Sequence, residues 1–381
     1  RCNGELTISA NPDDQGLNDI KLRLMERDSK DAITDVAAYI ALIVRHSINW
    51  FLDEHREEYL DSEIFWTMSV GLPADAVRQL DLERRFRLAA LVGAQSALSD
   101  ELCISESLVS KSYTLVCQDL HNVEVNNAYS EFEDLGCDTN VVAIVPEIAA
   151  QVVGLYRSHR WDSHNPISFL MDVGAGTVDS AVFSLVETKQ IDKELAFCAF
   201  SCDVSELGIV NLHQQRLKWL LDNLPKDLTD LAIVKEFLVN CLDKKSNQLR
   251  VPTSIGDYLN NAQICKGDEN QDPDTVFKKQ LWNHILQGVL KSAKENNSRD
   301  RVWENLRSLI CGGGARSKYY REFVESLSGQ LSIKLKIEPL EKPHNLRAPG
   351  LPSSEYDRLS VAYGLAQGTQ WEYRWPENIE K

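Results

Sequence analysis

The sequence is short of basic residues. Its 381 residues include 41 lysines and arginines against 57 aspartates and glutamates, which gives a formal net charge of −16. Binding to nucleic acid or to an anionic membrane surface needs a basic surface, so this balance argues against both partners. No apolar run reaches the roughly 18 to 20 residues that cross a bilayer. Arg1 is not followed by an apolar stretch of the kind that forms a secretory signal. We therefore expect a soluble, cytoplasmic protein.

The sequence also lacks paired cysteines. Its nine cysteines are scattered and never form a Cys-x-x-Cys pair, and Cys198 and Cys202 have no second pair of metal-binding residues at a suitable spacing. This pattern favours free, mostly buried thiols over a structural zinc site. The composition is 43% hydrophobic and 26% charged, which is typical of a globular protein, and the length predicts two to three domains.

One stretch carries the clearest chemical signal. Apolar runs at 167–171 and 178–186 flank a Gly-Ala-Gly-Thr turn, which predicts two strands joined by a tight turn. Without Cβ atoms, Gly174 and Gly176 let successive backbone N–H groups converge on an anion such as phosphate. Asp172 can hold a hydrated Mg²⁺, and Thr177 adds a hydroxyl at the same rim. The alternative is an ordinary hairpin whose glycines serve only the turn.

This stretch, Asp-x-Gly-x-Gly-Thr-x-Asp, resembles the second phosphate loop of the actin, sugar-kinase and heat-shock ATPase superfamily, and specifically its DnaK-type (heat-shock protein 70) branch. The resemblance implies an α/β fold of two lobes, ribonuclease H-like, with the nucleotide in the cleft between them. It implies that ATP or ADP binds with Mg²⁺. The phosphates would be held by Gly174, Ala175, Gly176 and Thr177, and Asp172 and Thr177 would serve the chemistry.

A second motif follows at the distance that this family implies. An apolar strand at 306–310 leads into three glycines and then a helix at about 318–327, a pattern that suits close approach of a nucleoside to the backbone. It resembles the adenosine motif of the family. The resemblance implies that Gly312, Gly313 and Gly314 hold the adenosine and that the planar guanidinium of Arg316 stacks on the base.

The segment Ser205-Glu-Leu-Gly208 opens a predicted helix over 210–220. The family has a Leu-Gly element here, which implies that the Gly208 backbone meets the terminal phosphate at a helix start. The alternative is a helix cap formed with Ser205 and Glu206.

The strand at 141–145 runs into Pro146, Glu147 and a helix to Tyr156, with proline at the helix start. The segment resembles the first connecting helix of the family. Aligning the prolines puts the family's catalytic glutamate on Val145, whereas aligning the alanine pair puts it on Pro146. Glu147 is the nearby candidate for positioning water, and the alternative is a carboxylate that interacts with the helix dipole.

Further elements follow from periodicity and turn signals. His213 and Arg216 are expected to be surface or packing residues, and residues 222–300 to form a helical outer subdomain. The other predicted elements are a helix at 31–55, a strand at 64–74, a helix at 82–98, a strand at 112–117, a strand at 194–200, a closing Val-Ala-Tyr-Gly helix at 357–368 and a tail at 371–375 that packs on the body or binds a partner.

These signals predict three parts. Lobe I covers 1–163 and ends with the connecting helix near 146–158. Lobe II covers 164–356 and contains the outer subdomain at about 210–300. Residues 357–381 form the closing helix and tail.

Two family features are missing from the printed sequence. No first phosphate loop fits before Asp31, so we expect either a fragment without its first hairpins or a domain that naturally lacks them. No peptide-binding domain follows, so a complete chaperone is not expected. The expected function is a heat-shock-protein-70-like ATPase module whose lobe closure is read by a partner protein. The alternatives are an inactive nucleotide-sensing or scaffold pseudo-ATPase, and a filament-forming or sugar-kinase relative.

Overall fold

The computed structural model describes residues 5–8, 20–26, 28–73, 79–125, 142–156, 167–188, 195–224, 236, 251–259, 272–297, 303–330, 333–338, 340, 342–350, 352, 356, 359–367 and 371–374. Within these ranges the chain is a mixed α/β protein. It divides into two compact units: Arg1–Leu72 with Ala76–Val145, and Pro73–Asp75 with Pro146–Lys381. No helix in the described ranges is long and apolar enough to cross a membrane.

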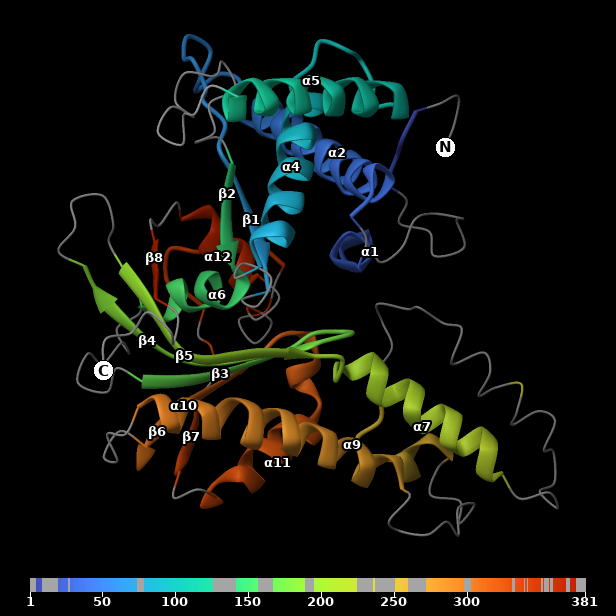
Figure 1. Cartoon of the computed structure of the whole chain (residues 1–381), viewed down its shortest axis with the longest axis vertical. Coiled ribbons are helices and arrows are strands. Elements are labelled where there is room, and N and C mark those ends of the chain that lie inside the picture. The colour runs from blue at the N-terminus through green and yellow to red at the C-terminus, as the bar shows by residue number, and fades with distance from the viewer. Residues whose placement is uncertain are drawn as a thin grey trace. The chain divides into compact units, whose positions relative to one another are not determined.

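The first unit packs helices beside a two-stranded sheet (Figure 1). Its elements are α1 (Ile20–Glu26), α2 (Lys30–Glu54), β1 (Met68–Leu72), α4 (Leu80–Ala97), α5 (Glu106–Val125) and β2 (Val142–Pro146). Helix α2 begins where the sequence predicts, because the hydroxyl of Ser29 accepts a hydrogen bond from Ala32 N at 3.2 Å. Helices α2 and α4 pack closely at Gly93, where an added Cβ would lie 2.7 Å from Ile40 Cγ2.

The strand predicted at 112–117 is wrong, because these residues lie inside helix α5. Valine, threonine and tyrosine favour strands locally. The buried positions, however, are Leu108, Val109, Ser112 and Val116, and this spacing of three and four residues is that of a helix. Burial of the helical stripe outweighs the local preference. Near the start of the chain, Glu5 and Ser105 form an isolated antiparallel bridge.

The second unit is built on a six-stranded sheet with the strand order β7-β6-β3-β4-β5-β8. Strands β3, β4 and β5 form an antiparallel meander, and β6 runs parallel to β3. The strands are β3 (Ile167–Val173), β4 (Val178–Glu187), β5 (Leu195–Ser205), β6 (Leu306–Cys311), β7 (Leu335–Glu338) and β8 (Trp371–Arg374). The helical elements are α6 (Glu147–Tyr156), α7 (Ile209–Asn223), η2 (Ile255–Leu259), α9 (Pro273–Trp282), η4 (Asn283–Leu290), α10 (Lys291–Asn296), η6 (Gly313–Arg316), α11 (Lys318–Leu327) and α12 (Ser360–Ala366).

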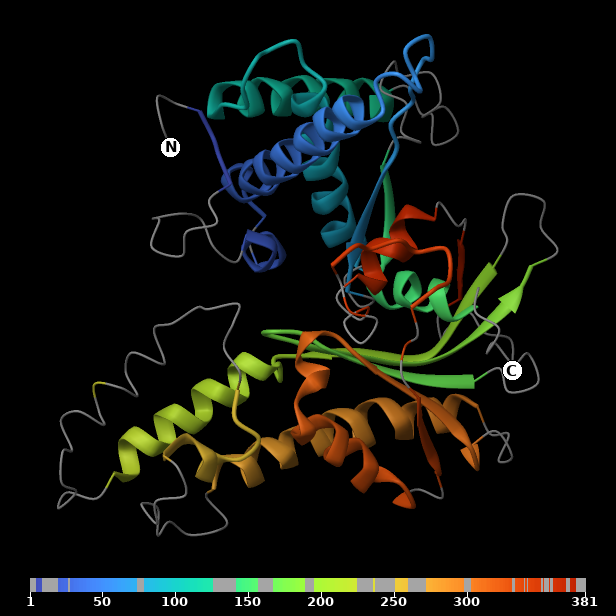
Figure 2. The same ribbon diagram turned by 180° about the vertical axis from the view of Figure 1, so that it is seen from behind.

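Helices cover both faces of this sheet. Helices α9, α10 and α11 lie on one face, and α6 with α12 lies on the other, as both views show (Figures 1 and 2). The first face buries alternate residues of β3, namely Ile167, Phe169, Met171 and Val173. The intervening residues, which include Asp172, therefore point toward the α6 face.

Helices α6 and α12 touch through their backbones. A Cβ added at Gly364 of α12 would overlap the backbone of Ala150 in α6. The close packing expected of the closing helix is thus confirmed. Helix α6 packs within the second unit, whereas the sequence predicts a domain boundary after it, at residue 163. The tail pairs as β8 with the edge of β5, so it packs on the body.

We predict that Gly364→Ala destabilises the second unit. The new methyl group has to push α12 away from α6, and overpacking of this kind costs about 1–3 kcal/mol. Urea unfolding measures the loss. The control is Gly313→Ala, because a Cβ there meets nothing within 4 Å. Equal stability of the two variants would show that the contact is not tight.

Helix α9 continues without a break through the π-helical segment η4 into α10. At the start of η4, Nδ1 of the buried His284 lies 3.1 Å from Oδ2 of Asp203 on β5. The hydrogen bond from His284 is the main cause that holds the pKa of Asp203 below its usual 3.8. The pair ties the helix to the sheet.

The lowered pKa of Asp203 predicts an acid-dependent part of the stability. This contribution is fully present above the ordinary carboxyl pKa and is lost as the pH falls below about 4 through the folded-state pKa. Thermal unfolding between pH 6 and pH 3 should therefore show a smaller loss of stability in Asp203→Asn than in the parent protein. An identical loss in both proteins would contradict the role of this pair.

Candidate functional site

The loop between β3 and β4 turns its carbonyl groups inward. Gly174 N donates to Thr177 O at 2.9 Å and closes the turn. The carbonyl oxygens of Gly174, Ala175 and Gly176 accept hydrogen bonds from Ile209, Val210 and Gly208, respectively, at 3.2, 2.9 and 3.1 Å. The loop therefore sits on the first N–H groups of α7. These N–H groups, which have no partner inside the helix, are satisfied by the loop.

The same geometry leaves the amides of the loop open. Within the described ranges, the backbone N–H groups of Ala175, Gly176 and Thr177 have no hydrogen-bond partner, and neither does the Thr177 hydroxyl. Ala175 is exposed and the other two residues are half-buried. A Cβ added at Gly176 would meet nothing within 4 Å. Three consecutive amides without an internal partner are donors that remain available to an anion.

Gly208 has a different part in this arrangement from the one that the sequence predicts. Its N–H group donates to Gly176 O and so does not point at a ligand. A Cβ at Gly208 would overlap the backbone of Ala175 and Gly176, so glycine is required for the contact between loop and helix. The alternative cap by Ser205 and Glu206 does not form either. Among the described residues, the Ser205 hydroxyl is buried without a hydrogen-bond partner, and Glu206 takes part through its backbone oxygen, which accepts a hydrogen bond from Asn211.

Two side chains that the sequence did not indicate support this contact. Asn211 Nδ2 donates to Gly176 O at 3.0 Å and to Glu206 O at 2.7 Å. The buried Tyr320 of α11 donates its hydroxyl to Leu207 O at 2.7 Å. Burial raises the pKa of Tyr320, so it remains a donor. No local sequence motif reveals either residue, because their partners lie elsewhere in the chain.

Asp172 lies at the end of β3, half-buried, directly beside the loop. Its Oδ2 accepts a hydrogen bond from Nε2 of Gln151 on α6, and Gln151 Oε1 accepts one from the thiol of Cys311 at 3.1 Å. The antiparallel register sets Asp172 opposite Asp179 of β4, on the same face of the sheet. The sequence analysis missed Gln151, whose only signal is that it is polar in an apolar helix.

The three glycines after β6 have three different surroundings. Gly312 has a φ of +83°, and a Cβ there would overlap Oδ1 of Asp172. At Gly314 a Cβ would lie 2.5 Å from Val173 Cγ1 and 3.2 Å from Ile209 Cβ. At Gly313 it would meet nothing within 4 Å. Gly312 and Gly314 therefore seat the turn against β3 and α7, and only Gly313 leaves open space.

The structure thus brings three distant segments together, namely 172–177, 207–211 and 311–316. Because β3 and β6 are parallel, with Asp172 opposite Cys311, both glycine loops leave the same edge of the sheet. Ligands of α/β sheets bind at such carboxyl-terminal edges. Arg316 ends η6 with an exposed side chain.

Pro146 and Glu147 lie at the start of the second unit. Pro146 is the last residue of β2 and Glu147 is the first of α6. Glu147 precedes Gln151 by four residues and so lies on the same face of the helix as the side chain that touches Asp172. In residues 5–8, 20–26 and 28–30 the structure has an isolated bridge and α1 but no hairpin of the phosphate-loop type.

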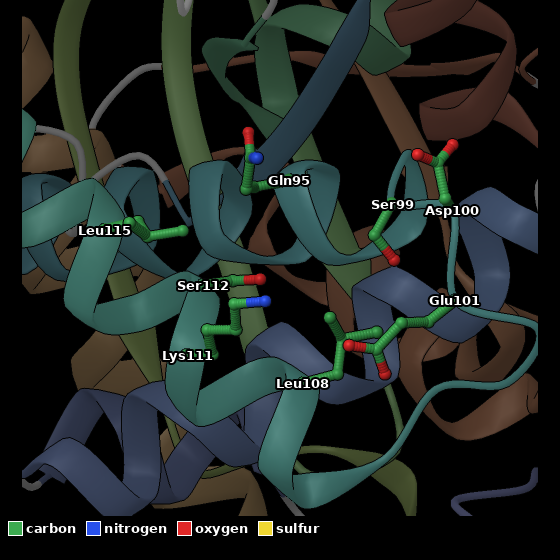
Figure 3. Close-up of a pocket in the computed structure, with 8 residues that line it drawn as sticks. All are labelled: Gln95, Ser99, Asp100, Glu101, Leu108, Lys111, Ser112 and Leu115. Atoms are coloured by element: carbon green, nitrogen blue, oxygen red, sulfur yellow. The ribbon is translucent and has the colours of Figure 1, made fainter.

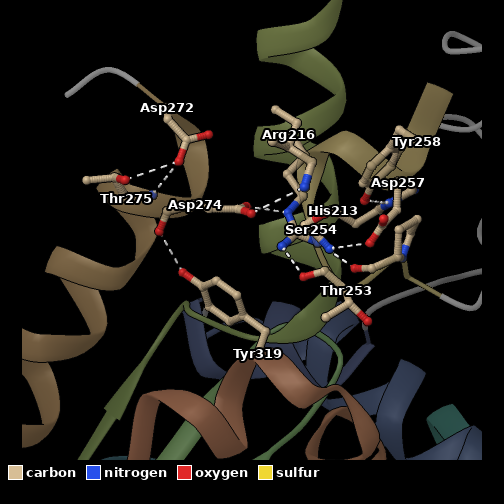
Figure 4. Close-up of polar contacts among 12 residues, drawn as sticks. His213, Arg216, Thr253, Ser254, Asp257, Tyr258, Asp272, Asp274, Thr275 and Tyr319 are labelled. Carbon is tan, nitrogen blue, oxygen red and sulfur yellow. Dashed lines mark hydrogen bonds and ion pairs between the residues drawn. The ribbon is translucent and has the colours of Figure 1, made fainter. Parts of the chain in front are cut away.

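The fully buried Arg216 joins α7 to residues 252, 253 and 274. These segments form the outer part of the second unit (Figure 4). The Arg216 guanidinium forms an ion pair with Asp274 and donates to Pro252 O at 2.6 Å and Thr253 O at 2.9 Å. Burial alone would lower the pKa of Arg216, but the hydrogen bond and charge of Asp274 raise it. Tyr319 donates to Asp274 O at 2.7 Å. The expectation of a packing role for Arg216 is therefore confirmed.

A separate cavity of about 330 Å³ lies in the first unit, between the end of α4 and α5 (Figure 3). Its lining residues are Gln95, Ser99, Asp100, Glu101, Leu108, Lys111, Ser112 and Leu115. Among the described residues, no group of three or more histidine, cysteine or acidic side chains is arranged to hold a metal ion.

No family model and no curated protein matches the chain. Among solved structures it is similar to a non-polymerisable quadruple mutant of pCBH ParM, with 17% identity, a TM-score of 0.31 and coverage of 61% of this chain and 55% of that chain. It is similar also to the archaeal actin homolog Ta0583 in complex with ADP, with 10% identity, a TM-score of 0.32 and coverage of 60% and 57%.

The chain spans a little over half the length of the solved structures that it matches.

We predict that Arg216→Met destabilises the second unit by about 3 kcal/mol, because it leaves the Asp274 carboxylate and two carbonyl groups without their main donor. Urea unfolding of this variant is compared with Lys218→Met, which removes an exposed cation from the same helix. If both variants unfold at the parent's urea concentration, the network does not hold the outer part together.

Proposed function

We propose that the chain is a nucleotide-binding module of the actin-like ATPase superfamily that holds Mg-ATP or Mg-ADP at the β3–β4 loop. The observation that carries the proposal is the set of three open amides, at Ala175, Gly176 and Thr177, beside the carboxylate of Asp172. In this proposal the amides and the Thr177 hydroxyl bind phosphate oxygens. Asp172 binds a water of the Mg²⁺ ion.

Charge supports the metal. An amide cluster favours an anion, but the Asp172 carboxylate beside it repels one, and Asp179 stands opposite on β4. A divalent cation between carboxylate and phosphate removes this conflict, and oxygen ligands with retained waters suit Mg²⁺. The donors present therefore fit Mg²⁺ with a phosphate and fit a bare phosphate less well.

The nucleoside is assigned to the turn after β6. The free space at Gly313 permits a ring to approach the backbone, and the exposed guanidinium of Arg316 can stack on a base. Gly312 and Gly314 contribute by seating this turn beside Asp172 and Val173. The heat-shock-protein-70-like assignment rests on the sequence motifs, including the Val-Ala-Tyr-Gly segment of α12.

Hydrolysis asks for a group that orients water, and Glu147 is the candidate because it shares a helix face with Gln151. Phosphoryl transfer depends mainly on positioning and charge. A chain that binds the nucleotide but does not use Glu147 to orient water would still act as a nucleotide sensor. We further propose that the nucleotide state is read by a partner protein.

Asp172→Ala should weaken Mg-ADP binding at least about tenfold, which corresponds to about 1.4 kcal/mol, because the hydrated metal loses the carboxylate that holds one of its waters. Calorimetric titration with Mg-ADP and Mg-ATP measures the effect. Asp222→Ala removes an exposed carboxylate at the end of α7 and is the matched control. No binding by the parent chain, or equal affinity of the two variants, would contradict the assignment.

Gly176→Val separates the site from the fold. The new side chain enters space in which a Cβ meets no protein atom within 4 Å. The free energy of unfolding should therefore change by about 0.5 kcal/mol or less, and the thermal midpoint should stay within about a degree of the parent's. The same side chain covers the open amides, so Mg-ADP binding should be lost. Retained binding would move the phosphates away from this loop.

A further inference from the structure

Gln151 is a polar residue in an apolar place. It is 1% exposed, and the residues beside it on α6, Ala150 and Val152, are fully buried. Burying an amide without hydrogen bonds costs free energy, so both halves of such a side chain need partners. Gln151 has both: its nitrogen donates to Oδ2 of Asp172, and its oxygen accepts from the thiol of Cys311.

The orientation of this amide is fixed by the chemistry of its partners. The Asp172 carboxylate accepts hydrogen bonds and offers no proton, so it requires the NH₂ group of Gln151. The Cys311 thiol has one proton to donate. Its Sγ lies 3.1 Å from the amide oxygen and 3.8 Å from Met171 O, so the amide oxygen is the nearer acceptor. Rotating the amide by 180° would place oxygen against carboxylate and NH₂ against the S–H group. Cys311 therefore keeps the donor of Gln151 turned toward Asp172.

We propose that Gln151 is a positioning residue for the Asp172 carboxylate, oriented by Cys311, and that it couples helix α6 to metal binding at the site. The inference rests on the proposed function, since it concerns the same Mg²⁺ site. One oxygen of Asp172 is held by Gln151, and the other lies against Gly312, where there is no room for a Cβ. The carboxylate thus has one preferred orientation.

Helix α6 has the connections that such coupling needs. The chain crosses from the first unit into the second at Val145–Pro146, and α6 begins at the next residue. One residue before Gln151, Ala150 is in backbone contact with Gly364 of α12. A shift of α6 along α12 would change the hydrogen bond to Asp172. By linkage, a metal-nucleotide that binds Asp172 would bias the position of α6 by the same free energy.

The test compares Gln151→Met with Ile148→Met. Both put methionine at a buried position of α6, but only the first removes a hydrogen bond to Asp172. Gln151→Met should lower the affinity for Mg-ADP about tenfold, the usual effect of losing a residue that orients the groups around a metal ion. The affinity for ADP measured in EDTA should stay unchanged, which a general loss of structure would not allow.

Cys311 gives a second arm. Cys311→Val removes the thiol donor and should weaken Mg-ADP binding, as Gln151→Met does. Cys311→Ser supplies a hydroxyl donor in place of the thiol and should keep the parent's affinity. Parent-level Mg-ADP affinity in Gln151→Met, or equal effects of the valine and serine variants, would overturn the proposal.

A third arm needs no nucleotide. The thermal midpoints of Gln151→Met, Asp172→Asn and the double variant form a cycle in the free protein. If the shift of the double variant differs from the sum of the two single shifts, the link between the two residues is supported. A double-variant shift equal to that sum overturns it. If the parent chain binds no Mg-nucleotide, the proposed function fails and the metal-positioning inference fails with it. If the parent binds normally and Gln151→Met matches Ile148→Met, only the inference fails.

Discussion

The candidate site depends on how the β3–β4 loop packs on the start of α7. Three loop carbonyls accept the first N–H groups of the helix, which turns the loop amides the other way. A helix N-terminus commonly binds anions directly, but here its donors are used internally. The consequence is that the donors left open to an anion belong to the loop. Gly208 matters because any side chain there would separate the loop from the helix.

The glycines of the site therefore divide into two kinds. Gly208, Gly312 and Gly314 are needed for backbone contact inside the protein, because a Cβ at each would overlap or crowd a neighbouring segment. Gly176 and Gly313 face open space and are the positions where a ligand can approach. A motif of glycines in a sequence does not distinguish these kinds. The distinction needs the neighbours that the fold supplies, and it separates stability effects from binding effects in glycine variants.

Local patterns predicted much of the fold. The helix at 318–327 and the strand, turn and strand around Gly174 were predicted because periodicity and glycine spacing are properties of neighbouring residues. The strand predicted at 112–117 failed because β-branched residues were weighed above the helical spacing of its buried positions. Gln151, Asn211 and Tyr320 escaped prediction because each acts on a segment that is distant in the sequence. The sequence indicated Asp172 as a candidate, but it did not indicate Gln151, the residue that donates to its carboxylate.

The most direct measurement of the central claim is the change in backbone amide NMR signals when Mg-ADP is added to the labelled chain. The account predicts that the amides of Ala175, Gly176 and Thr177 move strongly, because they gain phosphate acceptors. Those of Gly208, Ile209 and Val210 should move little, since the loop carbonyls already hold them. Large shifts at the start of α7 with none in the loop would contradict the account, because the helix and not the loop would then be the anion-binding element.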